Sequence, residues 1–261
     1  MRNTAIAAAL AVTGTAALAN DVEVADGQTS VVLDFATLEA AASLAFSSVS
    51  GDVIAPGSLE GSVAFPINAR DAAMLPTTFA YDYTDFLGTF SGTIEHTGSV
   101  LFNDDTVEVG NFTIGFDAGR VGTLEGAASG FFVESTTGVA AILFDIGAPS
   151  ALSAGAFELV IGADLLVSPE FGGFLFDNGL SEANLAGAAV GSALVEAGTG
   201  CSGADFNDSG RVNFLDVLGF VRAFVSYDDG ADVNADGMID FADVVDFVNA
   251  YVGCRSFRFG H

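Results

Sequence analysis

The sequence has 261 residues, of which 51% are hydrophobic, and its 34 acidic residues outweigh seven arginines to give a formal net charge of −27. A chain of this length and composition can bury a sizeable core, and it lacks the composition of a disordered protein. Because the chain contains no lysine and repels polyanions, we expect neither nucleic acid nor an anionic membrane surface as its partner.

The N-terminus, residues 1–19, predicts a secretory signal peptide. Arg2 precedes an apolar run that is too short to span a bilayer, and Ala17-Leu18-Ala19 has the small-x-small pattern of a cleavage site. Cleavage before Asn20 would remove Arg2 and change the formal charge from −27 to −28. No later segment has the pattern of a membrane span, so we expect a secreted protein, extracellular or at the cell surface.

Residues 20–197 predict a mainly β domain with a sandwich- or barrel-like fold. Gly, Ser, Thr, Phe and Val dominate this region, and short runs of alternating polarity are separated by turn residues. Short helices are expected within residues 39–46 and 168–176. The clearest strands are expected at Gly61–Asn68, Thr89–His96, Thr106–Asp117, Ser129–Ser135, Val139–Ile146 and Phe157–Val167.

The β-rich region offers little material for catalysis. His96 and His261 are the two histidines of the chain, Gly-x-Ser-x-Gly does not occur, and both cysteines follow residue 197. Serine-type, cysteine-type and zinc chemistry are therefore not expected, and we predict a non-catalytic protein. Glycoside hydrolysis by paired carboxylates stays open, because the separation of acidic side chains is not readable from a sequence.

One stretch of the β-rich region, residues 88–103, carries a distinctive pattern. Its Gly-x-Ile-x-His-x-Gly-x-Val run, centred on His96, resembles a strand-turn signature of secreted actinobacterial β domains related to heme-binding HtaA repeats. The similarity covers residues 58–117. It implies binding of heme or another small ligand, with Tyr81 or Tyr83 as the iron ligand and His96 in support. From the residues alone, a histidine that hydrogen-bonds its own turn is the other interpretation.

A Gly-rich joint at residues 198–200 leads into a duplicated segment at residues 201–254. The pattern that starts at Gly203 recurs 27 positions later from Gly230, with oxygen-bearing side chains at positions 1, 3, 5, 9 and 12 of a loop and Gly at position 6. This is the spacing of an EF-hand calcium loop, in which position 7 contributes its carbonyl. The expected ligands are Asp205, Asn207, Ser209, Arg211, Asn213 and Asp216 in the first loop, and Asp232, Asn234, Asp236, Met238, Asp240 and Asp243 in the second.

Each predicted loop precedes an amphipathic helix, because apolar residues such as Phe214, Leu218 and Val221 recur at helical spacing and return in the second copy. Two loop-helix units with Asp at the twelfth position resemble the type I dockerin repeat. The resemblance implies two calcium ions, calcium-dependent folding, and attachment to a cohesin-like or other extracellular protein partner. A calcium pair that merely stabilises a small domain stays open from the residues alone.

Cys201 and Cys254 bracket the duplicated segment and are predicted to form a disulfide, which export of the chain permits. Closing a loop of this length stabilises the folded state by about 4 kcal/mol in the chain-entropy model. Residues 255–261 are expected to form a C-terminal tail.

These patterns favour a secreted, non-catalytic calcium-binding protein whose C-terminal unit attaches a β-rich domain to a protein partner outside the cell. The alternative is a polysaccharide-degrading or carbohydrate-binding accessory protein that the same unit carries, with polysaccharide as the partner. The third interpretation is heme or small-ligand binding by the β-rich domain.

Overall fold

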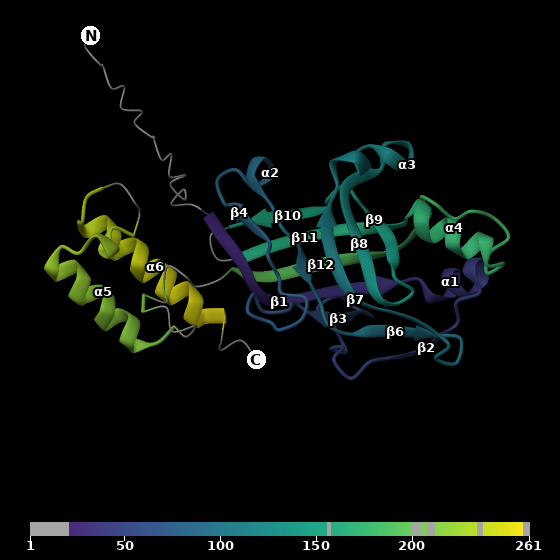
Figure 1. Cartoon of the computed structure of the whole chain (residues 1–261), viewed down its shortest axis with the longest axis horizontal. Coiled ribbons are helices and arrows are strands. Elements are labelled where there is room, and N and C mark those ends of the chain that lie inside the picture. Colours follow the sequence, from purple (N-terminus) through teal and green to yellow (C-terminus); the bar gives the residue numbers. More distant parts are fainter. Residues whose placement is uncertain are drawn as a thin grey trace, which may run out of the picture.

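The computed structural model describes residues 21–155, 158–199, 204, 206–207, 212–233 and 237–257, with side chains for all of these except 21 and 253–257 (Figure 1). The predicted signal peptide lies outside the described residues. So does the end of the predicted tail, whereas residues 255–257 continue the last helix. No helix in the described ranges is both long and apolar enough to cross a membrane.

Strands β1 to β12 of the described chain join into one antiparallel sheet in the order β2-β6-β7-β8-β9-β11-β12-β1-β3, with β4, β5 and β10 attached at its sides. The sheet curls into a half-barrel, so the predicted mainly β fold is confirmed. The strands are β1 (Asp21–Leu33), β2 (Phe46–Val49), β3 (Val63–Pro66), β4 (Ala80–Asp82), β5 (Ile94–Glu95), β6 (Ser99–Phe102), β7 (Val107–Phe116), β8 (Ala128–Gly138), β9 (Ala141–Gly147), β10 (Ala151–Ala154), β11 (Glu158–Val167) and β12 (Ala189–Thr199).

The helices lie at the ends of the curled sheet and beyond it. Figure 1 shows α1 and α4 together at one end, α2 toward the other, and α5 and α6 as a separate pair after the last strand. The helical segments are α1 (Phe35–Ala42), α2 (Phe86–Thr89), η1 (Ala118–Arg120), α3 (Thr123–Gly126), α4 (Pro169–Asp177), α5 (Phe214–Ser226), η2 (Asp229–Ala231) and α6 (Phe241–Phe257).

The short strand β5 nearly closes the curl. Its Ile94 pairs with Ile114 of β7, and at its other edge His96 forms a bridge with Ile67, directly after β3. The Asn68 amide also donates to the Glu95 carbonyl at 2.7 Å. Because β3 lies at one end of the strand order and β7 lies near the other end, these bonds bring the two ends of the curled sheet close together.

The interior of the curl is the main hydrophobic core. In β11, Leu159, Leu165 and Val167 point inward with the period of two that a strand imposes, and all three are buried. Helix α4 covers one end, where the Ser168 side chain caps the helix by accepting the Phe171 amide at 3.0 Å and Pro169 occupies the first turn.

Most strand predictions in the second half of the β-rich region are confirmed. The predictions for residues 106–117, 129–135, 139–146 and 157–167 correspond to β7, β8, β9 and β11, and the helix expected within 168–176 is α4. The first predicted strand, Gly61–Asn68, shortens to β3, and the helix expected within 39–46 is displaced to α1, which ends before the left-handed Ser43.

The prediction of a strand at Thr89–His96 is largely wrong. Residues 86–89 form α2, because Asp85 caps that turn by accepting the Gly88 amide at 3.2 Å. Gly92 then adopts a positive φ of 80°, which delays the strand to Ile94. Local capping therefore overrides the alternating pattern.

The helical pair α5 and α6 has its own small core. Phe220 and Phe247 occupy equivalent positions in the two copies of the duplicated segment, and their rings stack with centroids 4.2 Å apart and planes inclined by 6°. Ala204 and Ala231, also equivalent, are both fully buried. Equivalent residues of the two copies therefore form the core of the helical pair.

Replacing Phe247 by Ala is expected to lower the unfolding free energy of the helical pair by about 3 kcal/mol, because this ring is 2% exposed and stacked on its equivalent. Phe241→Ala, in the same helix but 74% exposed, should cost less than about 0.5 kcal/mol. Hydrogen exchange of α5 and α6 amides in the full chain measures both. Equal losses of protection would contradict the proposed core.

Candidate functional site

Seven of the twelve predicted calcium ligands lie within the described residues. They come from both loops: Asn207, Asn213, Asp216, Asp232, Met238, Asp240 and Asp243. The other five, Asp205, Ser209, Arg211, Asn234 and Asp236, lie outside the described residues.

The twelfth loop positions, Asp216 and Asp243, have closely matching environments. Both side chains are fully buried. Asp216 accepts the amide of Asn213 at 2.7 Å and the amide of Asn207, near the start of its loop, at 3.3 Å. Asp243 accepts the amide of Asp240 at 2.8 Å and that of Val233 at 2.9 Å. Each carboxylate therefore joins the start of its loop to the first turn of the helix that follows.

The second loop shows a further contact within itself. Oδ2 of Asp232, at loop position 1, accepts the amide of Gly237, at position 6, at 2.9 Å. Gly237 has φ of 82°, a left-handed conformation that favours glycine and turns the loop back toward its start. The ninth positions act as helix caps, since Asn213 accepts the Leu215 amide at 2.9 Å and Asp240 accepts the Ala242 amide at 2.8 Å.

The donor chemistry of the two loops fits calcium, because carboxylate, amide, hydroxyl and main-chain oxygens are the ligands that this cation takes. In the part of the chain that the structure describes, no three His, Cys, Asp or Glu side chains are grouped closely enough to hold a metal.

Helices α5 and α6 each carry a second apolar stripe that faces solvent. The apolar residues of the predicted pattern lie on both helices, but most of them are exposed, and Phe220 and Phe247 take the central place in the core. We call the exposed set the apolar stripe. It comprises Phe214, Leu218, Val221 and Val225 on α5 and their equivalents Phe241, Val245, Val248 and Val252 on α6, all exposed.

The candidate heme ligands of the β-rich region differ in their contacts and exposure. The Tyr81 hydroxyl is bonded to the carbonyls of Gly155 at 2.8 Å and Glu158 at 3.2 Å, and burial followed by the charge of Glu158 raises its pKa to about 12. Tyr83 is 38% exposed. The structure gives Tyr81 a hydrogen-bonding role, and iron binding stays a prediction.

His96 is fully enclosed and bonded through both ring nitrogens. Nδ1 lies 3.0 Å from the Phe112 carbonyl, which can only accept, so Nδ1 carries the proton and Nε2 accepts the Thr29 hydroxyl at 2.7 Å. Burial lowers the pKa of His96 to about 4, and the bond to Phe112 opposes that shift only in part. The interpretation of a histidine bonded to its own turn is wrong, because Thr29 belongs to β1 and Phe112 to β7, both outside the turn that follows His96.

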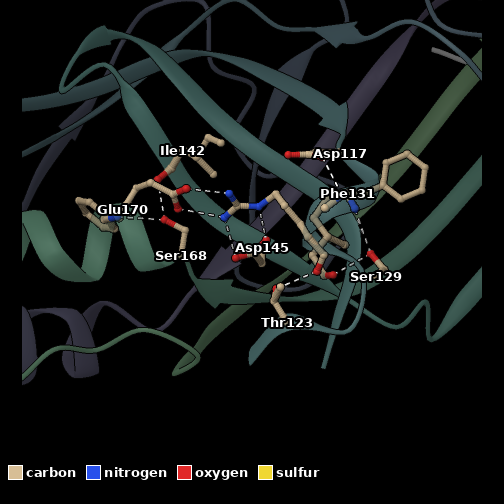
Figure 2. Close-up of polar contacts among 12 residues, drawn as sticks. Asp117, Thr123, Ser129, Phe131, Ile142, Asp145, Ser168 and Glu170 are labelled. Atoms are coloured by element: carbon tan, nitrogen blue, oxygen red, sulfur yellow. Dashed lines mark hydrogen bonds and ion pairs between the residues drawn. The ribbon is translucent and has the colours of Figure 1, made fainter. Parts of the chain in front are cut away.

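A polar cluster between η1, β9 and α4 is the strongest ion-pair network of the described residues (Figure 2). The Arg120 guanidinium donates to both oxygens of the fully buried Asp145, at 2.6 and 2.9 Å, and to both oxygens of Glu170, at 2.7 and 3.0 Å. The bond to Arg120 lowers the pKa of Glu170. With its donors engaged by two carboxylates, the arginine fastens the η1 turn to the sheet.

The predicted disulfide lies outside what the structure describes, because Cys201 and the side chain of Cys254 are not among the described groups.

The exposed apolar residues of the helical pair are a feature that the sequence analysis did not predict. The signal was present, since each helix is apolar at positions that no single face can hold.

Comparison with known proteins finds a distant structural likeness. No protein-family model matches the chain, and no curated protein matches it. Among solved structures, the C-terminal domain of HtaA from Corynebacterium glutamicum is 15% identical with a TM-score of 0.43, and the match covers 69% of this chain and 99% of that one. A likeness at this level says nothing about function.

The unfolding free energy of the β-rich part is expected to fall as the pH drops from 6.5 to about 4. The pKa of His96 is lowered on folding, so in this window the unfolded chain binds a proton that the folded chain does not. The whole loss attributable to His96 is about 3 kcal/mol. Denaturant titrations of wild type and His96→Gln across this pH range measure it. Parallel pH curves for the two proteins would contradict the assignment.

Proposed function

We propose that the duplicated unit, residues 201–254, binds two calcium ions and attaches the exported β-rich part of the chain to an extracellular protein. In this proposal the protein is non-catalytic, and the unit acts in the manner of the dockerin repeats that its sequence resembles. The partner is a cohesin-like module or another cell-surface protein that presents an apolar face.

The two buried carboxylates support calcium binding. A buried carboxylate is costly unless hydrogen bonds and a cation compensate it, and Asp216 and Asp243 occupy the same position in two loops rich in oxygen donors. Asp216 and Asp243 would hold the ions from the helix side, while Asp232 and Asp240 would approach from the loop side. When bound, calcium supplies the positive charge that offsets the four Asp of the second loop.

The apolar stripe is the observation that carries the docking proposal. Its members recur at i, i+4, i+7 and i+11 on both helices, so they form continuous rows, and contiguous exposed apolar rows mark interaction surfaces. A unit in which calcium served only to stabilise the fold would need the buried stack of Phe220 on Phe247, but it would not need an exposed apolar stripe. Because the chain is strongly acidic, the partner surface that fits best is apolar with a basic rim.

Calorimetric titration of the calcium-free full chain is expected to find two bound ions. Asp243→Asn should weaken the second site by roughly tenfold or more, since it removes a ligand charge of that loop. Asp246→Asn, which removes an exposed charge of the same helix, is the control and should leave both sites intact. A chain that binds no calcium, or a control variant that behaves like Asp243→Asn, would overturn the calcium proposal.

The docking role predicts calcium-dependent capture of one partner from the surface fraction of the source organism. A charge placed in both halves of the apolar stripe, Leu218→Glu with Val245→Glu, should abolish capture while calcium binding and helicity persist, because both side chains are exposed. Asp246→Asn should capture normally. Capture that survives the double substitution, or calcium-dependent self-association of the wild type in its place, would show that docking is not the function.

A further inference from the structure

Two of the cavities that the described residues line lie in the interior of the curled sheet. One, of about 80 Å³, lies at the end covered by α1 and α4, and the other, of about 350 Å³, lies at the end near α2. Ile114, Ile146, Ile161 and Val195 line both, so the cavities share a wall. The larger one reaches the lower range of small-molecule sites, which is about 300 to 1,000 Å³.

Five phenylalanines form the wall of the larger cavity, which we call the aromatic pocket. They are Phe79, Phe86, Phe90, Phe116 and Phe131. The rings brace one another: the Phe90 centroid lies 4.9 Å from that of Phe116 and 5.0 Å from that of Phe131, and these two are 5.1 Å apart. Such interlocked rings form a wall that is already in place before a ligand arrives.

Gly130 allows the ring of Phe116 to take its place in this wall. The residue has φ of 100°, and a Cβ atom there would come within 2.6 Å of the Phe116 ring. Any larger residue would therefore push Phe116 out of the wall. The pocket depends on a specific backbone conformation of β8.

Exposed apolar side chains mark where the aromatic pocket reaches the surface. Leu87 of α2 is 74% exposed, and Leu152 of β10 and Phe116 at the end of β7 are exposed as well, although all three belong to the wall. Leu87 of α2 and Leu152 of β10 line the same cavity, and Figure 1 shows both elements toward the same end of the sheet. A ligand that enters between them would cover apolar surface that now faces water.

The chemistry of the wall selects an uncharged ligand. Among the described residues the one polar side chain of the wall is Ser129, whose hydroxyl donates to the Ile146 carbonyl at 2.7 Å. A buried charge without a partner is strongly unfavourable, and the acidic chain also repels anions from the entrance. We propose that the aromatic pocket binds an uncharged aromatic small molecule, an activity independent of calcium docking by α5 and α6.

The test uses the full chain and N-phenyl-1-naphthylamine, an uncharged fluorescent probe. We expect saturable binding of one probe molecule with a blue shift of its emission, and binding at least about tenfold weaker for anilinonaphthalene sulfonate, which adds a negative charge to a similar aromatic body. Absence of saturable binding, or equal affinity for the two probes, would overturn the proposal.

Matched variants locate the probe. Leu87→Glu should weaken binding by about tenfold or more, because it places a charge at the entrance, whereas Met74→Glu, 78% exposed and outside the wall, should not. Leu152→Trp, which narrows the entrance without a charge, should also weaken it. Leu218→Glu on the apolar stripe should have no effect. Loss of binding in Leu218→Glu with retention in Leu87→Glu would place the probe on the helical pair and refute the pocket.

Discussion

The imidazole of His96 fastens the curled sheet across its interior. It donates to Phe112 of β7 and accepts from Thr29 of β1, two strands with β8, β9, β11 and β12 between them in the sheet order. Only curvature of the sheet brings both partners within reach of one ring, and the main chain of the same residue adds a bridge to Ile67. Burial favours the neutral imidazole and lowers the pKa of His96, because a charged ring would lie in an apolar interior.

The same curvature explains why the interior is not completely filled. At one end the side chains of Leu38 and Phe171, from α1 and α4, reduce the space to a small cavity. At the other end the covering element is α2, a four-residue helix that is too short to seal the opening. The phenylalanine rings there pack against one another and leave a cavity at the end of the sheet that no long helix of the described chain covers.

The sequence predicts the β-rich character, strands β7, β8, β9 and β11, helix α4 and the duplication, because each depends on local periodicity or capping. It does not predict the contact between His96 and Thr29, which are 67 residues apart, since sequence pattern carries no information about how far a sheet curls. It also assigns the apolar positions of α5 and α6 to a single face. In the structure Phe220 and Phe247 form the core, and Leu218 with its row faces solvent, because a pair of helices can bury only one face of each.

The helical pair couples its two loops through that core. Each twelfth-position carboxylate ties one loop to its own helix, so an ion lost from one loop would act first on that helix alone. The stack of Phe220 on Phe247, however, makes the position of each helix depend on the other. In the proposed function, a partner that needs both rows would respond to the occupancy of both loops, since the apolar stripe is divided between α5 and α6. In the proposed function, calcium binding at either loop therefore affects the helical pair that carries both rows.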